Sequence, residues 1–252
     1  MLPCKHSVYI LVPNITNVFS SGWHFDAVGV SAFRNLRKFT LRAEDDDGIA
    51  DMGEVRTVLD QNQHTLRHLI LGAYLERHHS WDSAFQSTTI KNLTHLDLVD
   101  TRISHIVLAR IAHANALQSL TLHGTLEEPG PAAVVFGSDQ VVDSVHTFLP
   151  HLEAFRFVLV GHEDATLYRS VVGLLRERRR LRRLDLGGCP WEMVVGLLPG
   201  LVGLRVLGVK MENVTQAAME ALVKGVPKEM IAMNLSTAVS DKAIVRRLIF
   251  RL

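Results

Sequence analysis

The chain repeats one spacing of apolar residues, in the order apolar-x-x-apolar-x-apolar. The last three positions of each copy alternate between apolar and variable side chains, as in a β-strand with one buried face. Successive copies begin about 28 residues apart on average, which indicates repeated structural units. The eight copies are Leu36, Phe39 and Leu41; Leu66, Leu69 and Leu71; Leu93, Leu96 and Leu98; Leu117, Leu120 and Leu122; Leu152, Phe155 and Phe157; Leu181, Leu184 and Leu186; Leu204, Leu207 and Val209; and Met230, Met233 and Leu235.

The stretches between these strands predict helices that return the chain to the next strand. Four stretches begin with a side chain that can cap a helix, followed by apolar residues at helical spacing. A unit of one strand and one helix cannot bury its apolar face alone, so neighbouring units are expected to stack. The predicted caps and faces are Ser104 with Val107, Leu108 and Ile111; Ser138 with Val141, Val142, Val145, Phe148 and Leu149; Asp164 with Leu167, Val171, Leu174 and Leu175; and Thr215 with Met219, Leu222 and Val223.

Two units resemble the leucine-rich-repeat consensus L-x-x-L-x-L-x-x-N/C-x-L. They span residues 93–103 and 181–191, and Cys189 occupies the Asn/Cys position of the second. The chain is similar to the ribonuclease-inhibitor-like and cysteine-containing subclasses of this family. The resemblance implies an α/β leucine-rich-repeat solenoid, a right-handed superhelix of about eight repeats. Its parallel strands would line the concave face and its helices the convex face.

The resemblance further implies one leucine-rich-repeat domain over residues 1–252. We expect an irregular N-terminal unit at 1–35, eight repeats at 36–240 and a C-terminal cap at 241–252. Most units depart from the consensus at its ninth position, so the asparagine ladder that ties successive turns together is expected to be missing. The residues at this position in the other units are Glu44, Tyr74, Thr101, Thr125, Val160, Glu212 and Ala238.

Long, degenerate arrays of this kind resemble the repeat region of fungal F-box proteins, in which the repeats select substrates for ubiquitin ligases. The resemblance implies a protein–protein interaction module, the substrate-recognition part of an F-box-like adaptor. Residues 1–35 contain no F-box, so this prediction depends on the repeats. The alternatives are a free-standing scaffold and a leucine-rich-repeat GTPase activator, whose regular Asn-rich repeats are not matched here.

The partner is expected on the strand positions that point away from the core. These are the third, fifth and seventh positions of each copy, and they mix charged, polar and small side chains. Such a surface suits a protein partner, because it lacks both a basic stripe for phosphates and an aromatic platform for bases. The alternative is that these side chains only solvate an unused face. The predicted contact residues are His68, His95, Asp97, His123, Arg156, Arg183 and Asp185.

Composition narrows the setting of the protein. The 252 residues include 27 basic and 26 acidic ones, and this balance predicts no general attraction to nucleic acid or to an anionic membrane. No apolar stretch approaches the roughly 20 residues that span a membrane. Only two cysteines occur, Cys4 and Cys189, which favours a reducing compartment, cytoplasmic or nuclear. Four Asn-x-Ser/Thr triplets, at Asn14, Asn92, Asn213 and Asn234, leave secretion as the alternative.

No motif predicts catalysis, a cofactor, a metal or a small-molecule substrate. The chain lacks a Gly-x-Ser-x-Gly elbow, a phosphate loop and a dinucleotide fingerprint, so we expect no enzyme. The acidic run 44–48 fails as a calcium loop, because Ala43 stands at the first ligand position. The 13 histidines show no Cys-x-x-Cys or His-Glu-x-x-His spacing.

Two further segments stand out. Six arginines lie between Arg176 and Arg183. They predict the junction of a helix end and a strand start, where arginines meet the negative helix pole, and the alternative is a nuclear-import or RNA contact. Residues Thr125 to Gly137 contain Pro129, Gly130 and Pro131, and they predict an inserted loop at the edge of the array.

Overall fold

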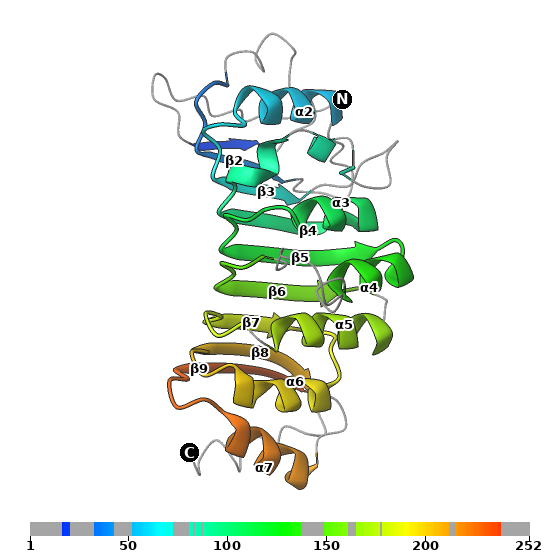
Figure 1. Cartoon of the computed structure of the whole chain (residues 1–252), viewed down its shortest axis with the longest axis vertical. Coiled ribbons are helices and arrows are strands. Elements are labelled where there is room, and N and C mark those ends of the chain that lie inside the picture. The colour runs from blue at the N-terminus through cyan, green and yellow to red at the C-terminus, as the bar shows by residue number, and fades with distance from the viewer. Residues whose placement is uncertain are drawn as a thin grey trace, which may run out of the picture.

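A computed structural model of the chain describes residues 17–20, 33–42, 52–72, 81–82, 84–86, 88–137, 149–160, 165–176, 178–211 and 215–237. Within these residues, nine strands form one all-parallel sheet, and their order in the sheet is their order along the chain. Figure 1 shows the strands lying one after another along the long axis of the molecule, with helices α3 to α7 along one side. The fold is therefore α/β with a single parallel sheet, as the pattern predicts.

The strands are β1 Asn17–Ser20, β2 Lys38–Arg42, β3 His68–Gly72, β4 His95–Ile103, β5 Ser119–Leu126, β6 Ala154–Leu159, β7 Arg183–Leu186, β8 Val206–Met211 and β9 Ala232–Thr237. The helices of the described segments are α2 Met52–Gln61, α3 His105–Ile111, α4 Pro129–Gly137, α5 Ala165–Leu175, α6 Trp191–Leu197 and α7 Gln216–Gly225. Short 3-10 turns occur at η1 Ala84–Gln86, η2 Thr88–Asn92 and η4 Leu198–Gly200.

The eight copies of the apolar pattern align in register. The third position of each copy pairs with the third position of the next, from Lys38 and His68 in β2 and β3 to Val206 and Ala232 in β8 and β9. The eight predicted strands are therefore confirmed. β1 is a ninth strand that the pattern does not predict, and it pairs with β2 through Asn17 and Lys38.

A repeated backbone junction precedes each strand from β3 to β9. At each step one carbonyl, from the residue before the preceding strand, accepts two consecutive backbone N–H groups of the next unit. The Arg37 carbonyl accepts from the N–H groups of Arg67 at 2.9 Å and His68 at 3.0 Å. We call the seven acceptors the carbonyl ladder: Arg37, Arg67, Thr94, Gln118, Glu153, Arg182 and Arg205. The ladder connects successive units through the backbone, so it places no demand on side-chain identity.

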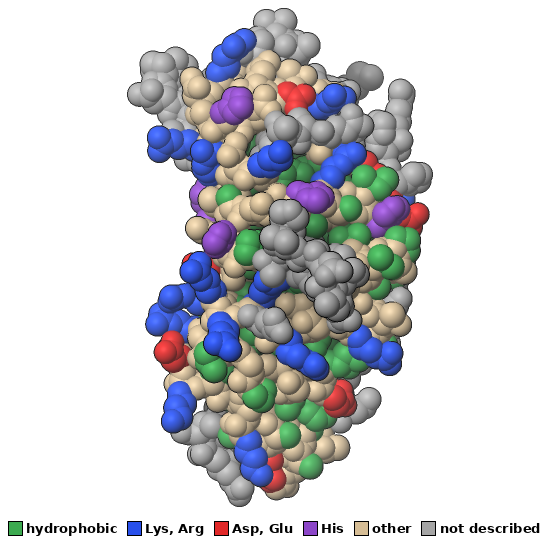
Figure 2. Space-filling model, in the orientation of Figure 1, with side chains coloured by type: hydrophobic (Ala, Val, Ile, Leu, Met, Phe, Trp, Pro, Cys, Tyr) green, Lys and Arg blue, Asp and Glu red, His purple; other side chains and the backbone are tan. Residues whose placement is uncertain are grey.

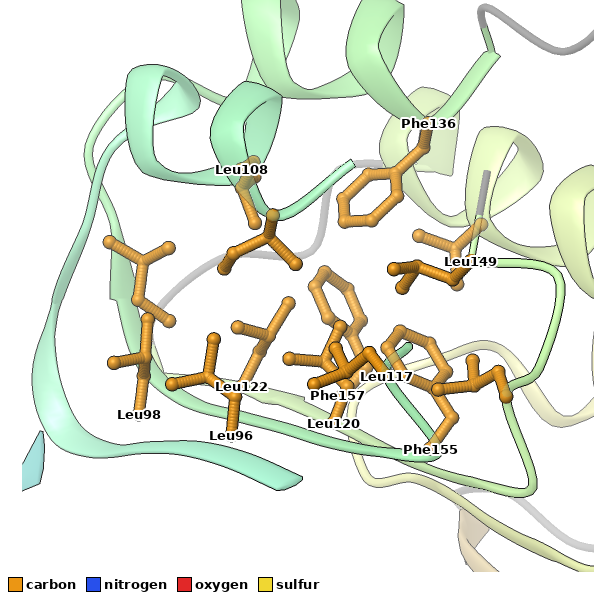
Figure 3. Packing of buried hydrophobic residues seen from close by; sticks show 14 of the residues in the cluster. Leu96, Leu98, Leu108, Leu117, Leu120, Leu122, Phe136, Leu149, Phe155 and Phe157 are labelled. Atoms are coloured by element: carbon orange, nitrogen blue, oxygen red, sulfur yellow. The ribbon is translucent and has the colours of Figure 1, made fainter. Parts of the chain in front are cut away.

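The core lies between the sheet and the helices. Figure 3 shows Leu96, Leu98 and Leu120 of the strands pointing toward Leu108 of α3 and Phe136 of α4. All five side chains are at most 1% exposed. An aromatic group joins α4, α5 and β6, because the rings of Phe136 and Tyr168 each meet the ring of Phe157 edge to face, with centroids 5.6 and 5.7 Å apart.

Two of the predicted helix caps are confirmed. The Ser104 hydroxyl accepts from the Val107 N–H at 3.1 Å, and the Thr215 hydroxyl accepts from the Ala218 N–H at 3.2 Å. The faces predicted behind these caps are buried, except that Val223 is only half-buried. α5 begins at Ala165 and buries its predicted face, while its predicted cap Asp164, the predicted helix after Ser138 and the run 44–48 lie outside the described residues.

The inserted loop predicted for Thr125 to Gly137 is wrong. β5 continues through Leu126, and α4 occupies Pro129–Gly137. Proline is tolerated in the first turn of a helix, where its missing N–H would have no intrahelical partner, so Pro129 and Pro131 start this helix and do not prevent it. α4 buries Phe136 together with two alanines, which gives it a place in the core.

The buried amide of Asn62 joins α2 to the chain that enters β2. Its Oδ1 accepts from the Leu36 N–H at 2.8 Å, and its Nδ2 donates to the carbonyls of Phe33 at 2.6 Å and Val58 at 2.7 Å. Asn62 is 1% exposed. It satisfies three backbone groups that would otherwise lose their hydrogen bonds, so it fixes the helix end relative to the strand.

None of the helices in the described part of the chain combines the length and the hydropathy that membrane crossing requires.

Candidate functional site

The sheet has a polar face opposite the core. Because strand side chains alternate, the third and fifth pattern positions of β2 to β9 point away from the leucines, and we call the surface they make the polar face. Six of the seven predicted contact residues lie on the polar face, and His123 lies at a seventh position beside it. Arg156 and Arg183 are exposed, and the other five are half-buried. Thr40 and Gly208 are the exceptions among the expected outward positions there, because both are buried, and so is Gly72 at a seventh position.

A hollow crosses the polar face from β4 to β9. It has a volume of about 390 Å³ and takes lining residues from six consecutive strands. Small side chains line it on β5 and β6, among them Ser119, Thr121 and Ala154, and charged side chains line it on β4, β6 and β7. A surface concavity lined by both small and charged side chains can accept a side chain or a segment of another molecule. Four of the predicted contact residues line it: Asp97, Arg156, Arg183 and Asp185.

Arg156 and Asp185 form an ion pair across β6 and β7. They are register partners, and the Arg156 Nε lies 3.3 Å from the Asp185 Oδ2. Both side chains are more than one-third exposed, so the pair contributes at most about 1 kcal/mol to stability. Gly208 makes room for this arrangement, because a Cβ there would lie only 2.8 Å from the Asp185 Cγ.

Arg183 stands in the same hollow without such a partner. Its register neighbours are Ala154 on β6 and Val206 on β8, and neither carries a charge. Among the residues that the structure describes, no acidic side chain lies within ion-pair distance of its guanidinium. The hollow therefore contains one arginine with an acidic partner, Arg156, and one arginine, Arg183, without an acidic partner among the described residues.

The structure separates His68 and His95 from the hollow. Their rings stack with centroids 4.1 Å apart and an interplanar angle of 8°. The His95 Nδ1 also lies 2.9 Å from the Thr94 hydroxyl. Burial lowers the pKa of His68, and the neighbouring charges of His95 and Lys38 lower it further, against a smaller opposite effect of Asp97. The two stacked rings lie together on the part of the polar face formed by β3 and β4.

His123 also lies apart from the hollow, and it pairs with an acidic residue that the pattern does not indicate. The His123 Nδ1 is 3.1 Å from the Asp100 Oδ1. Asp100 sits where the register of β4 and β5 shifts, with φ of 51°, and this bulge turns its side chain toward β5. Without knowledge of the bulge, strict alternation could not place Asp100 beside His123.

The arginine cluster occupies the predicted junction. α5 ends at Leu175 and β7 begins at Arg183, and Leu181 and Leu184 within this segment are fully buried. Arg180 contacts the His151 Nδ1 at 3.2 Å, and the Arg182 Nε lies 4.0 Å from the Glu153 carboxylate. Figure 2 shows Lys and Arg side chains along the margin where the strands begin.

The described residues give little support for catalytic or metal chemistry. Cys189 is 2% exposed, and burial, with a smaller effect of Glu192, raises the pKa of its thiol to about 12. A thiol so protonated at neutral pH is a poor nucleophile and a poor metal ligand. Within the described segments, no three His, Cys, Asp or Glu side chains gather in a way that could hold a metal ion.

A scan against models of known protein families finds no match for the chain, and a search of curated proteins finds no significant match either.

Proposed function

We propose that the chain is a leucine-rich-repeat solenoid whose polar face binds another protein. The observation that carries this proposal is the hollow, which draws its lining from six consecutive strands, β4 to β9. A surface assembled from so many units is extended enough to contact a folded partner or a long peptide segment. Its mixture of small, polar and charged side chains is typical of protein interfaces that are neither uniformly apolar nor uniformly basic.

The assignment to a solenoid is supported by three regularities. The strands follow one another in chain order, the eight pattern copies align in register, and the carbonyl ladder repeats the same two hydrogen bonds seven times. Each unit thus meets its neighbours in the same way, as in arrays whose units contact only the next unit. Such arrays present long surfaces for binding, which favours recognition over chemistry.

The net charge of the hollow favours a protein over a polyanion. Its charged lining residues are two arginines and two aspartates, so its formal charge is zero. A surface for nucleic acid would need an excess of cations to neutralise several phosphates. The polar face therefore suits a partner that brings both charged and uncharged side chains.

The test is an affinity capture from cell lysate with a variant whose hollow is filled. Thr121→Tyr with Ala154→Tyr places two large side chains on the floor of the hollow, and we call this the filled variant. Val134→Tyr with Val202→Tyr is the matched control, because both valines are exposed and lie outside the hollow, at 72% and 62% exposure.

We expect a set of proteins that the parent and the control capture and the filled variant does not, read by quantitative mass spectrometry. If the filled variant captures the same proteins as the parent, the polar face is not the binding surface. The adaptor function and the scaffold function stay predictions, and the same experiment separates them. An adaptor would also retain a ubiquitin-ligase linker protein, whereas a free-standing scaffold would not.

A further inference from the structure

We propose that the hollow recognises its protein partner through a carboxylate, a Glu or Asp side chain that binds the Arg183 guanidinium. This inference rests on the proposed function and adds the chemistry of the contact. It starts from the difference between the two arginines of the hollow: Arg156 has an acidic partner in Asp185, and Arg183 has none within the described residues.

The geometry of β7 keeps the two carboxylates of the hollow away from Arg183. Asp185 is two residues further along the same strand, about 7 Å away by backbone spacing, and its carboxylate is directed over Gly208 and toward Arg156. Asp97 lies on β4, three strands from β7, at a separation of about 14 Å. That distance exceeds the screening length of about 8 Å at physiological salt, so Asp97 does not neutralise Arg183.

The surroundings of Arg183 leave space for a partner side chain. Ala154 and Val206, on the neighbouring strands, are short and uncharged, and both line the hollow with Arg183. An arginine fork can bind a carboxylate with two parallel hydrogen bonds, and this pairing is stronger than a contact between neutral groups. The site therefore offers both a floor for the partner's chain and two donors for its acidic group.

The charge balance selects a single carboxylate over a phosphate group. A carboxylate brings one negative charge, which matches the one arginine of the hollow that lacks an acidic partner among the described residues. A phosphate brings close to two negative charges and would face the carboxylate of Asp185 on the same strand. A nucleic acid would bring several phosphates to a hollow whose formal charge is zero.

The experiment selects peptides from a phage-displayed random library on the intact chain and measures the affinities of the synthetic peptides. We expect the enriched peptides to share an Asp or Glu at one position. Its replacement by Asn or Gln should weaken binding about tenfold or more, as expected for a lost charged hydrogen bond. Arg183→Glu should cause a similar loss, and a peptide with Lys at the shared position should regain binding to this variant.

Arg179→Glu is the control, because Arg179 is exposed, belongs to the same arginine cluster and does not line the hollow. It should leave peptide affinity unchanged. Arg183 is exposed, so its replacement should preserve the fold, which circular dichroism and thermal unfolding verify.

The outcomes distinguish the two proposals. Peptides that the filled variant fails to bind, but that bind without any acidic requirement, overturn the carboxylate site and leave the proposed function standing. Selection that yields no hollow-dependent peptide also overturns the carboxylate site, and the lysate capture then decides the proposed function. If single-stranded oligonucleotides bind and Arg183→Glu abolishes that binding, the hollow is a nucleic-acid site and both proposals fail.

Discussion

β7 and β9 carry the same apolar pattern but bury it to different extents. In the copy that contains β7, the pattern residues Leu181, Leu184 and Leu186 are fully buried, whereas in the copy that contains β9 all three pattern residues, Met230, Met233 and Leu235, are only half-buried. The difference follows from neighbours, because β7 lies between β6 and β8, while β9 pairs only with β8 among the described strands. Burial in this fold is thus a property of a pair of adjacent units more than of one unit's sequence.

The two ends of the sheet also differ from one another. Toward the N-terminal end, the Asn62 amide joins α2 to the chain that enters β2. At the same offset before the last strand stands Val226, four residues before Met230, as Asn62 stands four before Leu66. Valine has no group that could bond the backbone, so the last unit depends on the carbonyl ladder and on packing with β8. The comparison predicts that mutations of buried residues lower stability most in the interior of the sheet and least at its C-terminal end.

The largest expected effect is a cavity in the interior. Leu184→Ala should lower the free energy of unfolding by about 3–5 kcal/mol, because the removed atoms are fully buried and packed on both sides. Met233→Ala, at the same pattern position in β9, should cost less than about 2 kcal/mol, because part of the lost surface is already in water. Urea unfolding followed by circular dichroism measures both, and equal losses would contradict the comparison.

The next effect concerns the buried Asn62 amide near the N-terminal end of the sheet. Asn62→Leu should lower the free energy of unfolding by about 2–3 kcal/mol, since three buried backbone groups lose their partners at once. Asn115→Leu is the matched control, because Asn115 is exposed and should change stability by less than about 0.5 kcal/mol. Calorimetry or urea unfolding gives the difference. A smaller loss of stability than in the control would show that the hydrogen bonds of Asn62 do not stabilise the fold.

The loss of a helix cap should have a smaller effect on stability, and it can be compared between the interior, at α3, and the C-terminal end, at α7. Thr215→Ala at exposed α7 should cost about 1 kcal/mol, the usual value for a lost cap. Ser104→Ala at α3 should cost about 2 kcal/mol, because the buried Ser104 hydroxyl also donates to the Asp82 carboxylate. The ranking is the result to check by urea unfolding, and the reverse order would show that burial does not decide the value of a cap here.

The smallest expected effect is a pH dependence of stability that comes from His68, at an interior strand of the polar face. The folded protein holds the pKa of His68 below the ordinary value of 6.5, so the unfolded chain binds the proton more readily. Stability should therefore fall as the pH drops through about 6.5 and level off below the lowered folded pKa. His68→Gln should reduce this fall, measured as the urea midpoint between pH 7.5 and 5.5, values chosen to lie about one unit on either side. His113→Gln, at an exposed histidine, is the matched substitution control.

Local pattern accounts for the strands and for part of the helices. The leucines predict eight strands correctly because each copy carries its own buried face, and the hydroxyls of Ser104 and Thr215 cap helices by purely local bonds. β1 is missed because residues 17–20 carry no copy of the pattern, and its place is set by pairing with β2. α4 is missed because Pro129 and Pro131 resemble loop residues unless the start of the helix is already known.

The candidate site was predictable as a surface but not as an arrangement. Alternation places Arg156, Arg183 and Asp185 on one face, since that property depends only on strand period. The ion pair of Arg156 with Asp185 depends on register and on the missing side chain of Gly208, neither of which a single strand encodes. The stacking of His68 with His95 likewise requires adjacent strands in register, so it appears only in the assembled sheet.

The direction of the backbone hydrogen bonds gives the molecule a mechanical character. Bonds between neighbouring parallel strands, including those of the carbonyl ladder, run along the long axis of the molecule (Figure 1). A force that pulls the two ends apart therefore loads these contacts in series, and each one can open without its neighbours. Extension should then proceed unit by unit, with each released unit lengthening the chain by roughly 80–120 Å, the reach of its extended residues. A protein built in this way should unfold gradually under tension, one unit at a time, with no single contact whose rupture unfolds the whole sheet.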